Sequence, residues 1–323
     1  MAGLTAEQLT QFETEGYVVV DHLLDPERDL DPIIAEYHGV LDRLANDLYA
    51  AGNISSTYSD LPFSDRLTQI YAESGHVHAQ YFDFSLPQNG VSHDTPFWTG
   101  PAVFNVIRHE RILDAIESLI GPEIYSNPVQ HVRMKPPERL VPIDPTTGQV
   151  QLGASPWHQD NGVVTEDADG TDIITVWFPL IDATEENGCL VVVPRSHEQG
   201  VLPHCPAPSG LHIPEQLFNP AAGIPLPMKR GSALFMTRRT LHCSLSNNSD
   251  HVRWSFDLRY NPIGQPTGRE VFPGFVARSK EDPDSELHDP EIWTELWTEA
   301  RRALAEHDIP RFNRWDSKAP VCA

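Results

Sequence analysis

His158 and Asp160, in the segment PWHQDNG, constrain the fold of this chain more than any other feature. In a β-strand, residues i and i+2 point to the same face, so an imidazole and a carboxylate at this spacing can bind one metal ion. A second histidine, His242, can join them only if another strand brings it to the same point. Two histidines and one carboxylate on one face of an octahedron leave positions open for a cosubstrate and dioxygen. The three residues therefore predict strands around a metal and suggest a non-haem Fe(II) oxygenase.

The His-x-Asp triplet is a weak motif by itself, because about one is expected by chance in a chain with 15 histidines. Stronger support comes from the segment after His242. Asn247, Asn248, Ser249 and Asp250 are turn formers between two segments of alternating polarity, which predicts a hairpin with a four-residue loop. In the register of that hairpin Ser244 lies opposite Arg253 and His242 lies opposite Ser255, with all four side chains on one face.

An arginine beside a hydroxyl and a metal-binding imidazole is suited to an anion that also reaches the metal. The planar guanidinium of Arg253 can hold a carboxylate by two parallel hydrogen bonds. The alternative interpretation is that Arg253 forms a salt bridge at the surface.

The order of these motifs resembles the phytanoyl-CoA dioxygenase family of Fe(II)- and 2-oxoglutarate-dependent oxygenases, which includes ectoine hydroxylase. The similarity rests on WHQD, on TVWFPLIDATEENGCLVVVPRSH, on HCS followed by an arginine eleven positions after His242, and on the opening LTAEQLTQFETEGYVVVDHLL. It runs from about residue 4 to about residue 262. It implies a mainly β protein with flanking helices, folded as a double-stranded β-helix, the jelly roll of cupins.

The resemblance also implies roles for individual residues. The Fe(II) ligands would be His158, Asp160 and His242, and the distal carboxylate of 2-oxoglutarate would be held by Arg253 and Ser244. Lys135 in HVRMKPP and Trp177 in TVWFPL match family positions near the cosubstrate. For Trp177 the alternative is a plain core aromatic.

The activity that the resemblance implies is oxidation of an unactivated C–H bond with O2, coupled to conversion of 2-oxoglutarate to succinate and CO2 and stimulated by ascorbate. Halogenating relatives replace the carboxylate ligand with Ala or Gly, so Asp160 favours hydroxylation, or desaturation or ring formation.

A second interpretation is a cupin-like barrel that binds Zn²⁺ at the same three residues, as a hydrolase or a non-catalytic small-molecule binder. Arg253 with Ser244 discriminates against it, because a zinc hydrolase has no evident need for that pair.

Length and composition predict one domain over residues 1–323, because no linker, repeat or low-complexity segment marks a boundary. We expect a helical part over about 1–125, a barrel over about 126–262 and a C-terminal extension over about 263–323. A capping-box pattern at Thr5–Gln8 predicts a helix that ends at Gly16 and precedes a strand. Helical spacing of apolar residues recurs over about 26–51 and 102–120, and we expect these helices outside the barrel.

The strand Val129–Lys135 alternates, with His131, Arg133 and Lys135 on one face and Val132 and Met134 on the other. This pattern predicts a polar face toward a cavity and an apolar face under helices. The long segments Pro136–Pro156 and Leu202–Pro227 are predicted lids, with disorder as the alternative. Asn187-Gly188 predicts a hairpin.

The last predicted helix, from about Pro290 to Glu306, carries Trp293 and Trp297 one turn apart, which is typical of core packing. One interpretation of His76, His78 and His93 is that they line the entrance of the cavity, but we expect most of them to be solvated loop residues.

The net charge of −23 and the pI near 4.9 argue against nucleic acid and anionic membranes as partners, and mildly against a coenzyme A thioester. No apolar segment is long enough to span a bilayer, and no secretory leader is recognisable. The four cysteines form no paired framework, which predicts a reducing compartment and a cytoplasmic protein. The predicted partner is a small-molecule substrate, and the sequence leaves the oligomeric state open.

Overall fold

The computed structural model describes residues 3–207, 210–307, 312 and 314–322. The helices are α1 (Ala6–Glu15), α2 (Asp31–Ala50), α3 (Phe63–Ser74), α4 (Pro101–Ile107), α5 (Glu110–Ile120) and α6 (Pro290–Glu306). The strands are β1 (Tyr17–Val20), β2 (Ile124–Ser126), β3 (His131–Lys135), β4 (Ile174–Pro179), β5 (Leu190–Val192), β6 (Cys205–Ala207), β7 (Gly210–His212), β8 (Ile224–Leu226), β9 (Ala233–Thr237), β10 (His242–Ser244), β11 (Arg253–Pro262) and β12 (Phe275–Arg278). None of the helices in these residues is long and apolar enough to cross a membrane.

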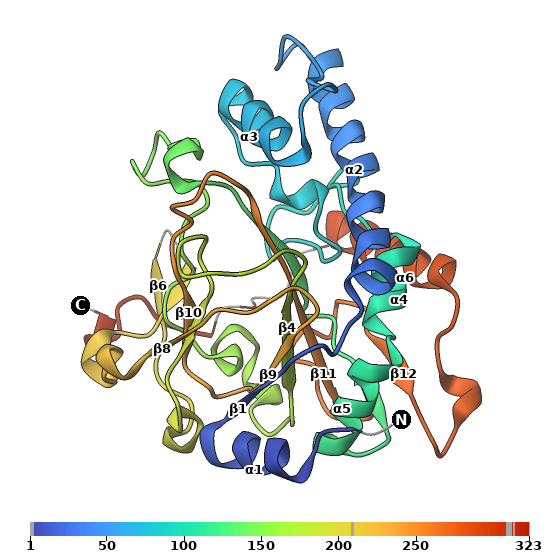
Figure 1. The fold of residues 1–323 in the computed structure, drawn as a ribbon, viewed down its shortest axis with the longest axis vertical. Helices are drawn as coiled ribbons and strands as arrows, with labels where there is room; N and C mark the ends of the chain where they lie inside the picture. Colours follow the sequence, from blue (N-terminus) through green and yellow to red (C-terminus); the bar gives the residue numbers. More distant parts are fainter. Residues whose placement is uncertain (1–2, 208–209, 308–311, 313, 323) are drawn as a thin grey trace.

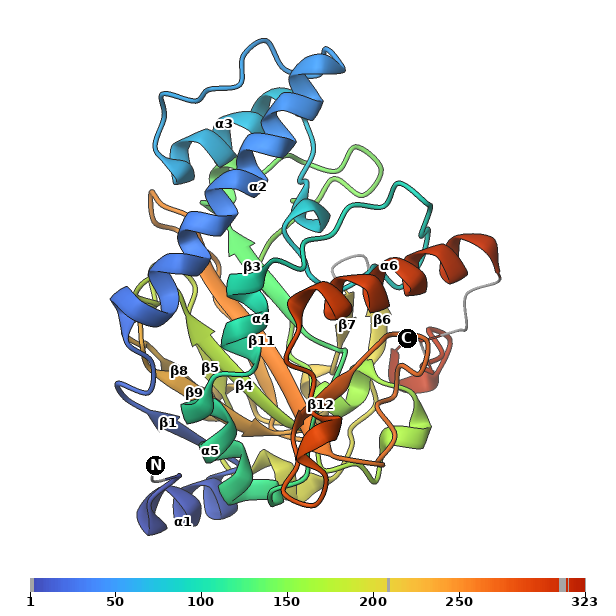
Figure 2. The ribbon, with the colours of Figure 1, turned by 90° about the vertical axis from the view of Figure 1, so that its right-hand side faces the viewer.

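Two antiparallel sheets form the walls of a jelly roll, which confirms the predicted fold class. The larger sheet has seven strands in the order β1-β9-β4-β11-β2-β12, with β3 also paired to β11. The smaller sheet has the order β10-β5-β8, and β6 and β7 form a separate ribbon. Figure 1 shows the two walls facing each other, and Figure 2 shows α2, α4, α5 and α6 on the outer side of the larger sheet. The expected outer position of the helices is thus confirmed.

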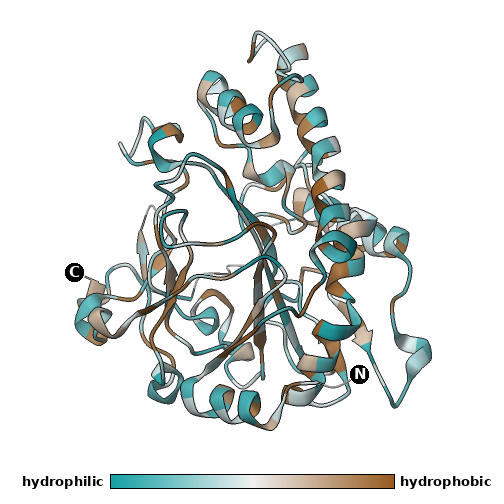
Figure 3. Cartoon of the chain, viewed as in Figure 1, coloured by the Kyte–Doolittle hydropathy of each residue, from teal (hydrophilic) through white to brown (hydrophobic). Residues whose placement is uncertain are grey.

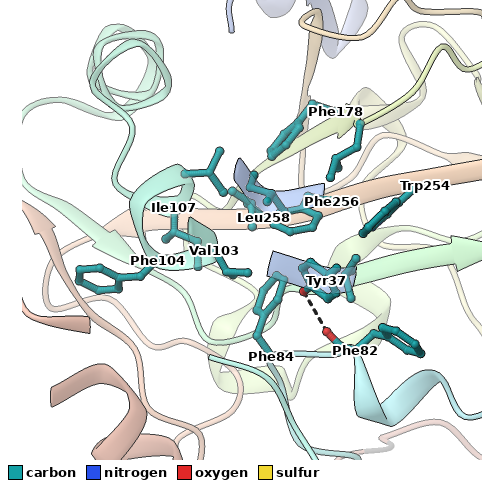
Figure 4. Packing of buried hydrophobic residues seen from close by; sticks show 14 of the residues in the cluster. Tyr37, Phe82, Phe84, Val103, Phe104, Ile107, Phe178, Trp254, Phe256 and Leu258 are labelled. Carbon is teal, nitrogen blue, oxygen red and sulfur yellow. Dashed lines mark hydrogen bonds between the residues drawn. The ribbon is translucent and has the colours of Figure 1, made fainter. Parts of the chain in front are cut away.

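Alternation along β11 separates the core from the interior of the barrel. Every second residue of this strand packs in the main hydrophobic cluster with the helices: Trp254, Phe256, Leu258 and Tyr260. Figure 4 shows this packing around Tyr37 of α2, whose hydroxyl donates a hydrogen bond to the Phe82 carbonyl. Each buried aromatic ring contributes on the order of 2 kcal/mol of hydrophobic stabilisation. The residues between them face inward: Arg253, Ser255, Asp257 and Arg259.

The same alternation holds on β3 and on the helices. Val132 and Met134 pack in the main cluster, which confirms the apolar face predicted for this strand. Figure 3 shows hydrophilic and hydrophobic residues alternating along α2, whose buried residues all join this cluster.

The N-terminal capping box is confirmed. Thr5 and Gln8 make both of its hydrogen bonds, and Gly16 ends α1 with φ 82°, in the left-handed region. The helix predicted over 102–120 is two helices, α4 and α5. They are separated at His109, which has non-helical backbone angles and accepts a hydrogen bond from the Arg111 N–H as the cap of α5.

The predicted hairpin after His242 is wrong. Strand β10 pairs with β5 in the smaller sheet, whereas β11 pairs with β3 and β4 in the larger one. Arg253 lies opposite Lys135 rather than Ser244, and Ser255 lies opposite Arg133. The chain does reverse direction at residues 247–250, as the turn formers predict. The reversal, however, connects the smaller sheet to the larger one and does not join two paired strands.

The hairpin predicted at Asn187-Gly188 is wrong for the same reason. The strands on either side, β4 and β5, belong to different sheets. The Asn187 side chain accepts a hydrogen bond from the Thr184 N–H and donates one to the Asp182 carbonyl, so the reversal is a local turn.

The C-terminal helix is confirmed as α6, and both of its tryptophans, Trp293 and Trp297, are buried in the main cluster. The expectation that no cysteines pair is wrong. Cys205 of β6 forms a disulfide with Cys322, with 5.5 Å between their Cα atoms, while Cys189 and Cys243 are free and buried. The disulfide removes the argument from cysteines for a reducing compartment.

We expect the disulfide to stabilise the protein, because it closes a loop with a sequence separation of 117 residues. In the chain-entropy model such a loop contributes about 4 to 5 kcal/mol. Urea unfolding of the wild type should therefore shift to lower urea in dithiothreitol. The double variant Cys205→Ser/Cys322→Ser should unfold at that lower midpoint with or without reductant. A wild-type midpoint that does not respond to reductant would contradict this expectation.

Candidate metal and cosubstrate site

His158 and His242 are held side by side by their own backbones. The N–H of each donates a 3.0 Å hydrogen bond to the carbonyl of the other, an antiparallel bridge between two segments far apart in sequence. Their ring centroids lie 4.2 Å apart. The Nδ1 atoms lie 2.8 Å from the Pro156 carbonyl and 3.0 Å from the Thr240 carbonyl. Since a carbonyl only accepts, both Nδ1 atoms carry the proton, and both Nε2 atoms are left for a metal.

Asp160 completes the group. Asp160 begins the short 3-10 helix Asp160–Val163. Of His158 and Asp160, which were both predicted on one strand, only His158 makes a β-type pairing. Oδ1 of Asp160 lies 4.0 Å from Nε2 of His242, and one ligand atom from each of the three residues lies within 4.8 Å of the others. The predicted trio therefore converges on a single point.

Two residues of the larger sheet fix the Asp160 carboxylate. Arg259 donates to Oδ1 at 2.5 Å, and the Thr175 hydroxyl donates to Oδ2. Thr175 on β4 lies opposite Arg259 on β11, so adjacent strands hold the two carboxylate oxygens. Burial raises the pKa of Asp160, but the charge and hydrogen bond of Arg259, together with the neighbouring His242 and His158, outweigh burial and hold that pKa well below its usual value. The carboxylate therefore remains ionised.

The donor set fits a divalent metal of mixed nitrogen and oxygen preference. Burial, followed by the neighbouring His242, lowers the pKa of His158 to about 3, so this imidazole is neutral at physiological pH. Two neutral imidazoles and one carboxylate are the ligands of non-haem Fe(II) sites.

A second group of predicted residues lies beside the metal-binding trio. Lys135 donates hydrogen bonds from Nζ to the Ser244 hydroxyl at 2.7 Å and to the Leu245 carbonyl at 3.0 Å. The Arg253 guanidinium lies over the Trp177 ring, 5.6 Å from its centroid. Ser244, Arg253 and Trp177 line one small cavity with both histidines. The structure therefore brings all seven predicted site residues together, although not through the predicted hairpin.

The two cations of this group lack a counterion. Lys135 and Arg253 are 4% and 2% exposed, and no described carboxylate lies within 4 Å of either. Burial, and then the nearby Arg253, lowers the pKa of Lys135 to about 6. Burial, and then Arg133, lowers the pKa of Arg253 to about 10. Nε of Arg253 has no partner among the described atoms. Buried charges in proteins are normally paired, so this pocket is built for an anion.

The residues that support Asp160 were not among those predicted from the sequence. Arg259 follows Arg253 by six positions on one strand, and even spacing places both on the inner face, so strand alternation was the available signal. A further support comes from the C-terminal segment, where the Trp315 indole donates to the Gly162 carbonyl at 2.7 Å and stacks on His204. His204 accepts the Gln159 N–H at 3.0 Å, directly beside both ligands.

A larger cavity of about 840 Å³ opens above the trio, lined by His158 and by much of the predicted lid Pro136–Pro156. The other predicted lid, Leu202–Pro227, contains β6, β7 and β8, and its residues 208–209 lie outside the described part. Closure of either segment stays a prediction.

The three histidines expected in loops differ in their surroundings. His93 is exposed, His76 is exposed at the rim of the larger cavity, and His78 is half-buried with its Nε2 3.0 Å from the Ser74 hydroxyl.

Comparison with known proteins agrees with this geometry. Residues 12–255 match the family model described as phytanoyl-CoA dioxygenase (PhyH). The chain belongs to the phytanoyl-CoA dioxygenase family. Phytanoyl-CoA dioxygenase domain-containing protein 1 of Danio rerio is 25% identical over 266 residues, covering 77% of this chain and 87% of that protein. A methylphosphonate hydroxylase of Gimesia maris is 32% identical over 106 residues, covering 33% of this chain and 40% of that protein.

Solved structures share the fold. The apo structure of the non-haem monooxygenase ThoJ aligns with a TM-score of 0.57 at 18% identity, covering 92% of this chain and 96% of ThoJ. The family resemblance seen in the sequence is thus confirmed. The protein is a dioxygenase of the phytanoyl-CoA dioxygenase family, and its His-Asp-His group is the type of ligand set that holds a non-haem iron.

We expect Arg259→Met to destabilise the metal-free protein by about 3 to 5 kcal/mol, because it leaves the buried Asp160 carboxylate unpaired. The matched control is Arg238→Met, which breaks an ion pair to the exposed Asp172 and should cost less than about 1 kcal/mol. Urea unfolding measures both changes. Added Fe(II) should recover part of the loss in Arg259→Met, since a cation replaces the missing charge. Equal stability of the two variants would contradict this role of Arg259.

The metal-free protein should lose stability as the pH falls below about 6.5. Burial lowers the folded-state pKa of His158 to about 3 and that of His204 to about 4, whereas both titrate near 6.5 when unfolded. Between these values the unfolded chain binds more protons, so stability rises with pH. At pH 5 the loss from His204 is about 2 kcal/mol. Urea unfolding at pH 7.5 and pH 5 tests this, and His204→Gln should show a smaller difference between them.

Proposed function

We propose that the protein hydroxylates an unactivated C–H bond of a small-molecule metabolite, using Fe(II), O2 and 2-oxoglutarate. The observation that carries this proposal is the pair of buried cations, Lys135 and Arg253, beside a His-Asp-His group. A dicarboxylate is the type of cosubstrate that can occupy both places at once.

In this proposal His158, Asp160 and His242 hold the metal. The ligand atoms are Nε2 of each histidine and an oxygen of the Asp160 carboxylate, and the backbone carbonyls of Pro156 and Thr240 keep the imidazoles in the required tautomer. Arg259 and Thr175 orient Asp160 and keep it ionised.

Arg253 holds the distal carboxylate of 2-oxoglutarate, with Ser244 and Lys135 as further donors. A bound carboxylate would restore the charge of Lys135, whose pKa is lowered by burial and by Arg253. Trp177 supports the Arg253 guanidinium from one side. Held at this end, the cosubstrate reaches the metal by its other end, which orients both for reaction.

When bound, the iron supplies the activation of dioxygen and the oxidising power, coupled to decarboxylation of the cosubstrate. The residues of the chain exclude water and fix positions. The single domain and its three parts, the small-molecule partner, the cytoplasmic location and stimulation by ascorbate remain predictions. Desaturation or ring formation would use the same residues.

The alternative of a zinc hydrolase or a non-catalytic binder uses the same three ligands but leaves the two buried cations without a purpose. Iron-dependent formation of succinate from 2-oxoglutarate distinguishes the dioxygenase from this alternative, because a hydrolase needs neither iron nor 2-oxoglutarate.

The test is anaerobic addition of Fe(II) and 2-oxoglutarate, which should produce a weak visible charge-transfer band. His242→Ala should abolish the band, since it removes a metal ligand. Arg253→Lys should raise the Kd of 2-oxoglutarate at least tenfold, because a point charge replaces a bidentate fork. Arg302→Lys, at an exposed position on α6, is the matched control and should leave both unchanged.

A charge-transfer band that persists in His242→Ala would contradict the assignment of the metal ligands. Arg253→Lys with the 2-oxoglutarate Kd of the wild type would remove the cosubstrate site. A zinc-loaded protein that hydrolyses esters, with no succinate formed by the iron form, would favour the alternative.

A further inference from the structure

Arg133 lies on β3, two residues before Lys135, with its side chain on the inner face of the barrel. It is exposed, in contrast to the buried Val132, Met134 and Lys135 of the same strand. It lines both the small cavity that holds Arg253 and Ser244 and the larger cavity that opens above His158. Figure 2 shows β3 beside β11, the strand that carries Arg253. The guanidinium of Arg133 therefore stands where a molecule in the larger cavity would meet the metal and the cosubstrate.

The described residues give Arg133 no ion pair and no hydrogen bond. The inward-facing carboxylate next to it on β11, Asp257, lies 3.4 Å from Arg259 instead. The neighbouring arginine, Arg139, is on the outside and pairs with Asp250. A free guanidinium next to a metal site is thus available to a ligand.

Positive charge is in excess around the metal, and Arg133 contributes to it. The inward-facing cations are Arg133, Lys135, Arg253 and Arg259, whereas the inward-facing carboxylates are Asp160 and Asp257, both beside Arg259. A divalent metal balances the two charges of 2-oxoglutarate. Positive charge therefore remains uncompensated when metal and cosubstrate are both bound, and Arg133 is the one of these four cations that is exposed to a ligand in the larger cavity.

The larger cavity also contains acidic side chains. Glu138 and Asp144 line it, and neither lines the small cavity. A ligand with one anionic end is therefore favoured in one orientation, with that end at Arg133 and the rest toward these two carboxylates.

We propose that Arg133 binds an anionic group, a carboxylate or phosphonate, of the molecule that is oxidised, and that it thereby determines substrate class. This inference rests on the proposed function and deepens it. Arg133 places the anionic end beside the metal, so the C–H bond that reacts lies within a few bonds of the charged group. A neutral or positively charged remainder faces Glu138 and Asp144.

The experiment uses small probes, because the site should bind an isolated anion. The Fe(II) protein with saturating 2-oxoglutarate is titrated anaerobically with methylphosphonate and, separately, with ¹³C-labelled acetate; acetamide is the neutral isostere of acetate. Paramagnetic Fe(II) broadens the ³¹P or ¹³C resonance of a probe bound close to it. Wild-type protein should give saturable broadening by at least one anion and none by acetamide. Which anion binds more tightly distinguishes phosphonate from carboxylate substrates.

Two substitutions locate the effect. Arg133→Gln should raise the Kd of the anion at least tenfold, while Arg302→Gln, the same change of charge at an exposed position on α6, should leave it unchanged. Arg133→Lys, which keeps the charge without the fork, should raise it two- to fivefold and serves if Arg133→Gln does not fold. The Kd of 2-oxoglutarate should rise less than threefold in each Arg133 variant.

The proposal is overturned by any of three results: no saturable broadening in the wild type, equal broadening by acetamide, or an unchanged anion Kd in Arg133→Gln. It is also overturned if the Kd of 2-oxoglutarate rises as much as that of the probe, because Arg133 would then belong to the cosubstrate site. If wild-type protein with Fe(II) and 2-oxoglutarate gives no charge-transfer band, the result would instead contradict the proposed function. A normal band without anion binding contradicts this inference alone.

Discussion

Side chains of β11 alternate between the helix-covered core and the barrel interior, and the site depends on this period of two. Trp254, Phe256 and Leu258 supply the outer face that anchors the strand under the helices. Because the strand is anchored in this way, Arg253 and Arg259 must face inward. A slip of one residue would bury both arginines among aromatic rings and expose the aromatic face to the metal. Packing on one face thus fixes the chemistry of the other.

This dependence explains how much of the site could be predicted from the sequence. Alternation was visible on β3, and the prediction that His131, Arg133 and Lys135 share a face follows from local pattern alone. His158 and Asp160 were predictable as a pair because they lie two residues apart, although Asp160 begins a 3-10 helix and does not continue a strand. His242 and the cosubstrate residues came from motif order in a family whose membership is confirmed. Ser244, Lys135 and Arg253 do meet beside the histidines, as expected.

The pairing of strands was not predictable in the same way. A cluster such as Asn247–Asp250 specifies that the chain reverses, but the hydrogen bonds of the next strand depend on partners far away in sequence. In a jelly roll, consecutive strands often belong to opposite walls, and here β10 and β11 do so. The disulfide Cys205–Cys322 was missed for a related reason, since neither the spacing of two cysteines nor their number specifies which of them meet. Arg259 was missed because no motif marks a residue that supports a ligand.

The overall charge of −23 gives no indication of the charge inside the barrel. The acidic residues that produce it are mostly solvated, and their field at the metal is weakened by water and salt. In the interior, a few buried charged groups determine the electrostatic field. Asp160 and Arg259 cancel each other at short range, whereas Arg253 and Lys135 have no described counterion. Strand register forces these cations together, since Arg253 lies opposite Lys135. Burial, and then the charge of Arg253, lowers the pKa of Lys135, and an anion bound between the two side chains would offset both effects. The pocket therefore favours an anion over an uncharged ligand of the same shape, because the uncharged ligand would leave Arg253 buried without a counterion.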